Sequence, residues 1–182
     1  VYSIRNAGII LVAACGNSTT NIDISPTFPA SYPLDNIVSV AYTTRNDTLS
    51  AASNYGATNV DLAAPGEQIN STFAATDNFY LANSGSSFAA PFVTGAFALM
   101  LAKYPTETHQ QIIRRVLEAT DPVPALAGKC VTGGRLNLHK ALSPPIQLTV
   151  VPTPSSAPFQ LRLSSGANRT CIIETSSSLT NW

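Results

Sequence analysis

The chain has 182 residues, of which 45% are hydrophobic and 11% are charged, and its formal net charge is zero. This length suffices for one domain of ordinary size and part of a second, while the charge balance provides no basic surface for nucleic acid. Pro, Gly or polar residues interrupt the apolar runs, which predicts no membrane span, and three scattered cysteines are too few for a disulfide framework or a zinc site.

The first third of the chain predicts a parallel sheet. A short helix end over residues 1–7 precedes an apolar run at Ile9–Cys15, and two further strand-like runs follow at Ile37–Tyr42 and Val60–Ala63. Continuous runs of Ile, Leu, Val and Ala are typical of strands that helices cover on both faces, and such strands are usually parallel. A further extended piece is expected over 68–73.

Three helices are predicted after this sheet. A nearly continuous apolar and small-residue run predicts a central helix near 87–103 that is buried on all sides. An apolar stripe with helical spacing predicts a second, amphipathic helix near 107–119, with Thr106 as its N-cap. A shorter helix is expected near 135–142. Strands alternating with helices indicate an α/β fold over residues 1–142.

The composition changes after residue 142. Residues 143–158 are rich in Pro and Ser and predict an extended linker. An alternating pattern from Phe159, with a second run at 171–174, predicts a β-hairpin that begins a β-rich accessory module over 159–182. Two strands are too few to fold alone, so this module is predicted to be incomplete.

Ser87 is the candidate nucleophile. It would lie in the first turn of the central helix, where free backbone N–H groups and the positive end of the helix dipole favour developing negative charge. Pro91, four residues later, lacks the N–H that would bond to the Ser87 carbonyl. The alternative is that Ser86 or Ser87 only caps the helix, as serines at this position often do.

Several blocks occur in the order found in one family. The subtilisin-like serine proteases (peptidase S8, subtilases) carry a nucleophile motif, Gly-Thr-Ser-Met-Ala-x-Pro, which is similar to Gly85-Ser86-Ser87-Phe88-Ala89-Ala90-Pro91. Their strand ending in Ala-Gly-Asn is similar to Ala14-Cys15-Gly16-Asn17. Further similar blocks lie at 28–33, 37–40, 53–56 and 60–66. The resemblance covers residues 1–142 and implies the C-terminal half of a three-layer subtilisin-like catalytic domain with a parallel sheet.

The resemblance also implies an activity and site residues. The family are secreted endopeptidases that act on peptides and proteins through an acyl-enzyme and require no cofactor. Ser87 would be the nucleophile, and the Asn17 side chain would be an oxyanion-hole donor. One wall of the first specificity pocket would consist of Ala13, Ala14, Cys15 and Gly16. A structural calcium ion at Asp61 is a further expectation, although one carboxylate is weak support because calcium takes six to eight oxygen ligands.

The catalytic Asp and His of this family precede the serine in the chain, and both are expected upstream of Val1. The two histidines present, His109 and His139, do not lie in a block that resembles the family's histidine motif, and both are predicted to be surface residues. The chain does not begin with Met. We therefore expect a fragment that is inactive alone and needs an upstream segment of the same chain to supply Asp and His.

Four alternatives stand beside this interpretation. The order Ser87, Asp121, His139 is that of the α/β-hydrolases, but their nucleophile follows an apolar strand, whereas residues 76–84 are mixed and polar. The sedolisins carry an aspartate where this chain has Asn17. A non-catalytic relative that binds peptides, or an interaction module acting through its tail, would have no reason to keep both nucleophile and oxyanion donor.

Overall fold

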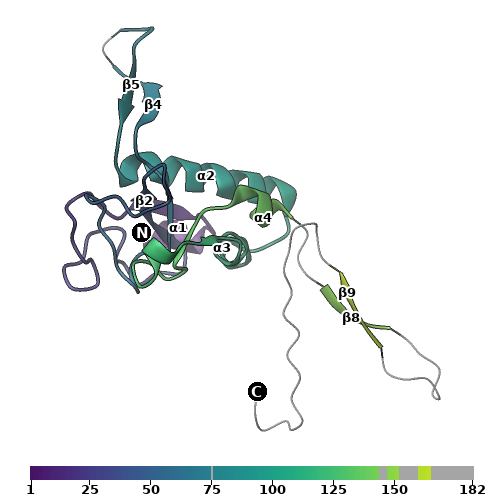
Figure 1. The fold of residues 1–182 in the computed structure, drawn as a ribbon. Helices are drawn as coiled ribbons and strands as arrows, with labels where there is room; N and C mark the ends of the chain where they lie inside the picture. Colours follow the sequence, from purple (N-terminus) through teal and green to yellow (C-terminus); the bar gives the residue numbers. More distant parts are fainter. Residues whose placement is uncertain (75, 144–146, 152–159, 165–182) are drawn as a thin grey trace. The chain divides into compact units, whose positions relative to one another are not determined.

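The computed structural model describes residues 1–74, 76–143, 147–151 and 160–164 (Figure 1). The chain separates into two compact units, Val1–Leu142 and Ser143–Trp182. The first unit begins with a short helix, α1 (Tyr2–Asn6), which Gly8 follows in a left-handed conformation.

A five-stranded sheet forms the centre of the first unit, with the strand order β1-β2-β3-β7-β6. Its strands are β1 (Leu11–Ala14), β2 (Ile37–Thr43), β3 (Leu62–Pro65), β6 (Asp121–Pro122) and β7 (Gly134–Arg135). The strands β1, β2, β3 and β7 run parallel to one another, whereas the edge strand β6 runs antiparallel to β7. The predicted α/β fold is confirmed, with a sheet that is mostly rather than wholly parallel.

The predicted strands correspond to the first three strands of this sheet. The strand expected at Val60–Ala63 begins two residues later, at Leu62. The Asp61 carboxylate accepts the N–H of Ser39 at 2.7 Å, so this N–H bonds to a side chain and not to a backbone carbonyl of the neighbouring strand. Regular strand pairing therefore begins only after Asp61. All seven residues of β2 are buried, as its continuous apolar pattern predicts.

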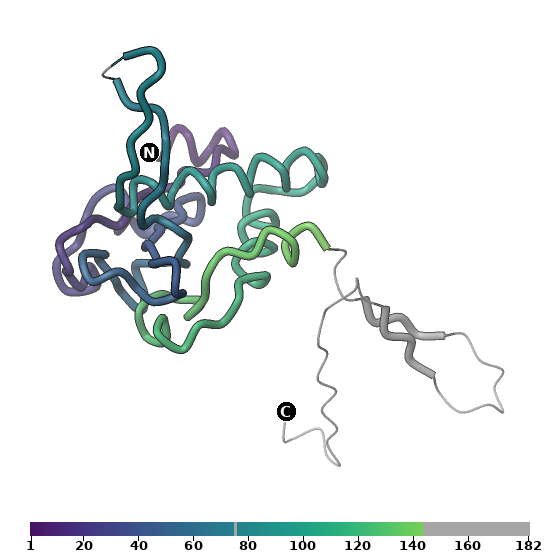
Figure 2. Tube along the Cα trace, turned by 45° about the horizontal axis from the view of Figure 1, so that its top comes forward, coloured from purple at the N-terminus to yellow at the C-terminus, as the bar shows by residue number. Residues whose placement is uncertain are grey.

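A second, two-stranded sheet consists of β4 (Ile69–Thr72) and β5 (Tyr80–Asn83), which pair as an antiparallel hairpin. The hairpin stands away from the rest of the unit in both views (Figures 1 and 2). The first of its strands lies in the stretch predicted to be extended. The second was not predicted, because its polar neighbours give no apolar alternation.

The central helix, α2 (Ser86–Lys103), packs on β1, β2 and β3 and also contacts the two later helices. These helices are α3 (His109–Glu118) and α4 (Leu138–Leu142). The core residues of α2 recur every three to four positions and include Ala89, Val93 and Met100. The prediction that this helix is buried on all sides is wrong, because Phe92, Leu99 and Leu101 are 43–48% exposed.

The same helix is long and apolar enough to cross a membrane, the only one in the described part of the chain with that property. Its packing against three strands explains the composition otherwise, because a helix in the core of an α/β unit needs small and apolar residues along its contact face. We therefore interpret α2 as a core helix.

The two later helices begin later than predicted. The N-cap of α3 is Thr108, not Thr106, and it forms a capping box with Gln111. Helix α4 begins at Leu138 rather than 135 because residues 134 and 135 pair in the sheet.

Two clusters of buried side chains cover the two faces of the sheet. The first joins β2 residues such as Val38 and Val40 to the helices α2, α3 and α4. The second joins Ala41 to the loop residue Ile22 and to Leu126 in a short 3-10 helix, η1 (Pro124–Leu126). In the described part of the chain, loops and η1 therefore cover the second face of the sheet. The sequence had predicted that helices would cover both faces.

The second unit contains an antiparallel pair, β8 (Gln147–Val151) and β9 (Gln160–Ser164). Strand β8 lies within residues 143–158, which were predicted to be an extended linker, and most of the other residues of that stretch lie outside the described residues. The predicted partner strand at 171–174 lies outside the described residues. The observed register instead pairs Leu148 with Leu163 and Val150 with Leu161.

Candidate active site

The candidate site lies where the carboxyl end of β1 meets the N-terminus of α2. Asn17 follows β1, and its side-chain oxygen Oδ1 accepts hydrogen bonds from the backbone N–H of Ser86 at 2.8 Å and from the Ser86 hydroxyl at 2.9 Å. These two residues are 69 positions apart in sequence, and the next residue is Ser87. The carboxyl edge of a parallel sheet is where open α/β folds place their ligands.

Ser87 is exposed, whereas Ser86 is fully buried. The N-cap position of α2 is Gly85, and no side chain caps the helix, so the capping alternative for both serines is not supported. Among the described residues, neither the hydroxyl nor the N–H of Ser87 has a hydrogen-bond partner. Because Pro91 lies inside the helix, the Ser87 carbonyl also receives no bond from the following turn.

The turn before α2 depends on two close backbone approaches. The N–H of Gly85 donates to the carbonyl oxygen of Gly66 at 2.8 Å. A Cβ atom on Gly66 would lie only 2.7 Å from the Gly85 carbonyl oxygen, and one on Gly85 would lie 3.1 Å from Nδ2 of Asn17. The contact of Gly66 with Gly85 therefore fixes where α2 begins. The Asn17 amide lies against the same backbone, just before Ser87.

The loop that carries Asn17 is held by Asn54, a buried residue that sequence reasoning treated only as part of a turn. Its Nδ2 donates to the Cys15 carbonyl at 2.9 Å, and its Oδ1 accepts the N–H groups of Ser18 and Thr20 at 2.8 and 2.9 Å. Its own N–H donates to the carbonyl of Gly16 at 2.9 Å. These bonds fix the backbone on both sides of Asn17. The signal in the sequence was its place in the block 53–56, which resembles a family block.

The four predicted pocket residues differ in exposure. The side chains of Ala13 and Cys15 are buried in the second core cluster, whereas Ala14 and Gly16 are half-buried. Burial raises the pKa of the Cys15 thiol to about 11, and its Sγ donates to the carbonyl of Asn54 at 3.2 Å. The substrate-binding role of these residues stays a prediction, and only Ala14 and Gly16 have surface with which to fulfil it.

The Asp61 carboxylate accepts one hydrogen bond, from the N–H of Ser39. Burial raises the pKa of this carboxyl to about 6, and the hydrogen bond from Ser39 opposes that shift. Among the described residues, no three His, Cys, Asp or Glu side chains cluster in a way that could hold a metal ion. A single buried carboxylate that already accepts a backbone N–H does not fit the oxygen-rich shell that calcium requires.

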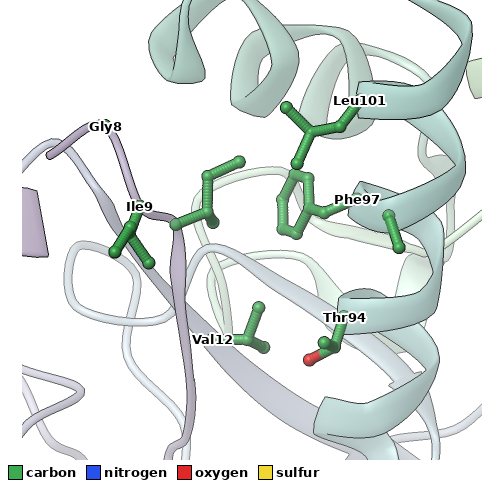
Figure 3. Close-up of a pocket in the computed structure, with 8 residues that line it drawn as sticks. Gly8, Ile9, Val12, Thr94, Phe97 and Leu101 are labelled. Carbon is green, nitrogen blue, oxygen red and sulfur yellow. The ribbon is translucent and has the colours of Figure 1, made fainter. Parts of the chain in front are cut away.

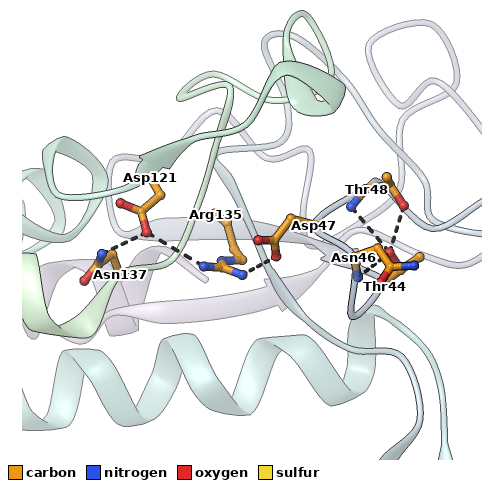
Figure 4. Close-up of polar contacts among 7 residues, drawn as sticks. All are labelled: Thr44, Asn46, Asp47, Thr48, Asp121, Arg135 and Asn137. Atoms are coloured by element: carbon orange, nitrogen blue, oxygen red, sulfur yellow. Dashed lines mark hydrogen bonds and ion pairs between the residues drawn. The ribbon is translucent and has the colours of Figure 1, made fainter.

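The two histidines do not serve Ser87 in this structure, because its hydroxyl has no partner among the described residues. Of the two predicted surface residues, His139 is exposed and His109 is half-buried, with its Nε2 buried and without a hydrogen-bond partner at the start of α3. Asp121 accepts a hydrogen bond from Asn137 at 2.8 Å and forms an ion pair with Arg135 at 3.8 Å (Figure 4). It also forms an ion pair with Lys140 at 2.6 Å. These contacts give Asp121 a structural role, which removes support for the α/β-hydrolase alternative.

Comparison with known proteins agrees with this geometry. The sequence model of the subtilase family matches residues 1–142. The chain is 34% identical over 141 residues to Subtilisin-like protease 2 of Plasmodium falciparum (isolate 3D7), which covers 78% of this chain and 10% of that protein. It is 36% identical over 137 residues to thermitase of Thermoactinomyces vulgaris, which covers 75% of this chain and 45% of thermitase. The chain thus spans less than half of the length of these two relatives.

A solved structure of the prenylagaramide maturation protease PagA matches with a TM-score of 0.64 and 24% sequence identity, covering 76% of this chain and 51% of PagA. At this identity the likeness shows the fold alone. The family match covers the whole first unit, including the strand that precedes Asn17 and the helix that carries Ser87. The chain therefore belongs to the subtilase family of serine proteases, peptidase S8.

Proposed function

We propose that this chain is the nucleophile-bearing part of a serine endopeptidase. The observation that carries the proposal is the contact between Asn17 and the N-terminus of α2, beside the exposed hydroxyl of Ser87. That contact places a side-chain amide and a free backbone N–H at the same helix end. Two donors beside a nucleophile are what the tetrahedral intermediate of acyl transfer requires.

In the proposed reaction, Ser87 Oγ attacks the carbonyl carbon of a peptide bond and transfers its proton to a histidine base. The oxyanion then accepts hydrogen bonds from Nδ2 of Asn17 and from the Ser87 N–H. When the C–N bond breaks, the histidine returns the proton to the leaving amine. Water then hydrolyses the acyl-serine ester by the same route. Every reacting group is a protein group or water, so the reaction needs no cofactor.

The base must come from elsewhere, and we propose that an upstream segment of the same chain supplies both His and Asp. This proposal is supported by the observation that the chain covers only 10% and 45% of the length of the two relatives. So does an apolar groove of about 310 Å³ between β1 and α2. Figure 3 shows the side chains of Ile9, Val12, Phe97 and Leu101 lining it. Strand β1 is also an edge strand, so its outer side is available for a further strand.

Secretion is part of the same proposal and rests on the family resemblance. We do not extend the proposal to a structural calcium ion, because within the described part of the chain Asp61 belongs to no cluster of three His, Cys, Asp or Glu side chains that could hold a metal ion.

The test compares the full-length protein with this chain, each with Ser87→Ala, on a chromogenic peptide and with a serine-directed fluorophosphonate. We expect Ser87-dependent turnover and labelling in the full-length protein and little turnover by this chain alone, because an unassisted serine hydroxyl is a weak nucleophile. Ser3→Ala, at an exposed serine in α1, is the control and should keep full activity.

Turnover that survives Ser87→Ala in the full-length protein would refute the assignment of the nucleophile. Peptide binding without turnover or labelling would identify the non-catalytic, peptide-binding alternative. Fast, Ser87-dependent turnover by this chain alone would mean that His109 or His139 acts as the base.

A further inference from the structure

The hairpin of β4 and β5 has one apolar face and one mainly polar face. Side chains that pair across an antiparallel ladder point to the same face, and successive pairs alternate between the two faces. The pairs on the apolar face are Ile69 with Asn83, Ser71 with Leu81, and Phe73 with Phe79. The pairs on the other face are Asn70 with Ala82, and Thr72 with Tyr80. Neither strand contains a charged residue, so an uncharged row of apolar side chains runs along one side of the hairpin.

This apolar face is open to solvent. Phe73 and Phe79 are 50% and 40% exposed, and Leu81 is 39% exposed. The two phenylalanine rings contact each other edge to face, with their centroids 6.1 Å apart. The hairpin stands away from the rest of the unit in both views (Figures 1 and 2). Exposed apolar surface of this kind marks a binding site.

A groove of about 290 Å³ connects the hairpin to the proposed active site. It is lined by three residues of β4 and three of α2, namely Ile69, Asn70, Ser71, Phe88, Pro91 and Phe92. Asn70 and Ser71 point to opposite faces of the hairpin, and both line the groove, so the groove follows the edge of β4. Phe88 is the residue directly after Ser87. The groove therefore begins beside the proposed nucleophile and runs along β4 toward Phe73.

We propose that the edge of β4 and the apolar face of the hairpin form an exosite, a surface outside the reacting site that binds the substrate segment after the scissile bond. Ala14 and Gly16, the accessible part of the predicted first specificity pocket, belong to the end of β1. The groove instead lies beside Phe88, in the first turn of α2. A peptide whose acyl side chain lies against β1 thus has its leaving-amine segment on the hairpin side. This inference rests on the proposed function.

The hairpin fits an extended peptide. Within the described part of the chain, β4 and β5 pair only with each other, so β4 has a free edge to which a peptide strand can add. The side chains on the apolar face repeat every two residues, about 7 Å, which is also the repeat of an extended peptide. Ile69 and Phe73 are roughly 13 Å apart along the strand, so the fourth to sixth residues after the scissile bond would reach the phenylalanine pair.

The shape of the apolar face identifies its partner. It is one cross-strand pair wide, it is uncharged, and it continues a groove that begins beside Ser87. A second copy of the protein or a lipid surface would require a broader apolar area. A peptide segment with apolar side chains at alternate positions matches both the width and the spacing. The proposed endopeptidase should therefore prefer substrates that carry such a segment after the cleaved bond.

The test measures kcat/KM of the full-length protein for two fluorogenic peptides that mass spectrometry shows to be cut at the same bond. One has Phe and the other Ser at the fourth and sixth positions after that bond. We expect the Phe peptide to be preferred by roughly 5- to 20-fold, mainly through a lower KM, because the contact lies away from the reacting atoms. Phe73→Ser and Phe79→Ser should each lower this preference by roughly threefold or more, whereas Phe73→Leu should keep most of it.

Tyr80→Ser is the matched control, because it removes an aromatic side chain that is 61% exposed on the opposite face of the same hairpin. It should leave the preference unchanged. The preference is a ratio measured on one enzyme preparation, so a partly unfolded variant still reports it. The dissociation constants of the two peptides, measured by fluorescence anisotropy with the full-length Ser87→Ala protein, should show the same preference and the same loss with Phe73→Ser.

Equal kcat/KM values for the two peptides, or a preference that survives both phenylalanine substitutions, would overturn the inference. So would self-association or vesicle binding that Phe73→Ser abolishes in a protein without the preference, because the apolar face would then serve a second copy or a lipid surface. These outcomes leave Ser87 as the nucleophile. Turnover of both peptides that does not depend on Ser87 would instead refute the proposed function, and the dissociation constants would still decide whether the hairpin binds peptide.

Discussion

Asn54 shows how one buried side chain can stabilise a loop that is otherwise exposed. Its amide bonds to both sides of residue 17, and no Cβ could be added to Gly16, because it would lie 2.3 Å from Nδ2 of Asn54. Each of these hydrogen bonds contributes about 1 kcal/mol net to the free energy of unfolding, and together they restrict the whole turn. The position of Asn17 therefore depends on contacts made 37 residues further along the chain.

Asp61 should make the stability of the protein depend on pH. Burial raises the pKa of its carboxyl from 3.8 to about 6, so the folded protein keeps a proton that the unfolded chain loses. The free energy of unfolding should therefore fall as pH rises from about 4 to about 6, by roughly 1–3 kcal/mol, and stay lower above that range. The measurement is the urea midpoint of the full-length protein between pH 4 and pH 8.

Asp61→Asn is the matched variant, because an amide oxygen can still accept the N–H of Ser39. It should be more stable than the parent protein above pH 6, and the decline between pH 4 and pH 6 should become smaller. A decline of unchanged size in the variant would show that another group is responsible.

Local sequence motifs were sufficient to propose two of the candidate site residues. Ser87 and Asn17 lie in short local motifs, so their sequence neighbours identify them. Asn54 and Ser86 gain their roles from partners 34 to 70 residues away, and no local pattern encodes such distances. The buried Nε2 of His109 was missed for the same reason, because the residues around this ring come from distant parts of the chain: its other nitrogen, Nδ1, would lie 3.8 Å from a Cβ on Gly8.

At the scale of elements, α3 offers a direct comparison of two threonines. Thr108 forms the capping box, whereas Thr106, the predicted cap, lies outside the helix. Thr108→Ala should lower the free energy of unfolding by about 1 kcal/mol, because an N–H of the first turn loses its acceptor. Thr106→Ala should have almost no effect. Equal losses in chemical denaturation would show that the observed cap does not stabilise α3.

A second prediction concerns the ion pairs formed by Arg135, a residue of β7. Arg135 forms ion pairs with Asp47, in the turn after β2, and with Asp121 in β6 (Figure 4). Both side chains of the second pair are 29% exposed, so water screens them only in part. Arg135→Gln should lower the free energy of unfolding by about 1–2 kcal/mol, because two elements lose a shared partner.

The control for that variant is Arg114→Gln. Arg114 pairs with Glu118 at 3.8 Å, but the two side chains are 78% and 69% exposed. Exposed pairs of this kind contribute little, so its effect in thermal or urea unfolding should be close to zero. If both variants lose the same stability, the network at β7 has no special role.

The accuracy of prediction also varied with the type of element. Strands β1 and β2 and helix α2 have long apolar patterns, and such patterns are the strongest signal in a sequence. Strands β6 and β7 have two residues each, too few for any periodicity. The boundaries of α3 and α4 moved because a capping bond and a strand pair, rather than propensity, determine where each helix begins.

At the scale of the whole molecule, the groove between β1 and α2 gives opposite expectations for two forms of the protein. Leu101 lines the groove and is 43% exposed in this chain. If an upstream segment covers it, Leu101→Glu should destabilise the full-length protein by roughly 2–4 kcal/mol, because a charge would be buried without a partner. In this chain alone the same change should increase solubility, because it interrupts an apolar surface.

Ile24→Glu provides the control. Ile24 is an apolar loop residue that is 79% exposed and does not line the groove. It should change the stability of the full-length protein very little. A similarly small effect of Leu101→Glu in the full-length protein, measured by chemical denaturation, would show that the groove is not covered.

The hydrogen bond between Gly85 and Gly66 has a practical consequence for engineering. It brings together the two ends of the segment that contains β4 and β5, so the hairpin leaves and rejoins the fold at one place. A peptide tag inserted between Asp77 and Asn78, in the connection between β4 and β5, would thus be separated from α2 by the two strands and by the hydrogen bond between Gly85 and Gly66. That position offers a route to label or immobilise the protein without moving the end of the helix that carries Ser87.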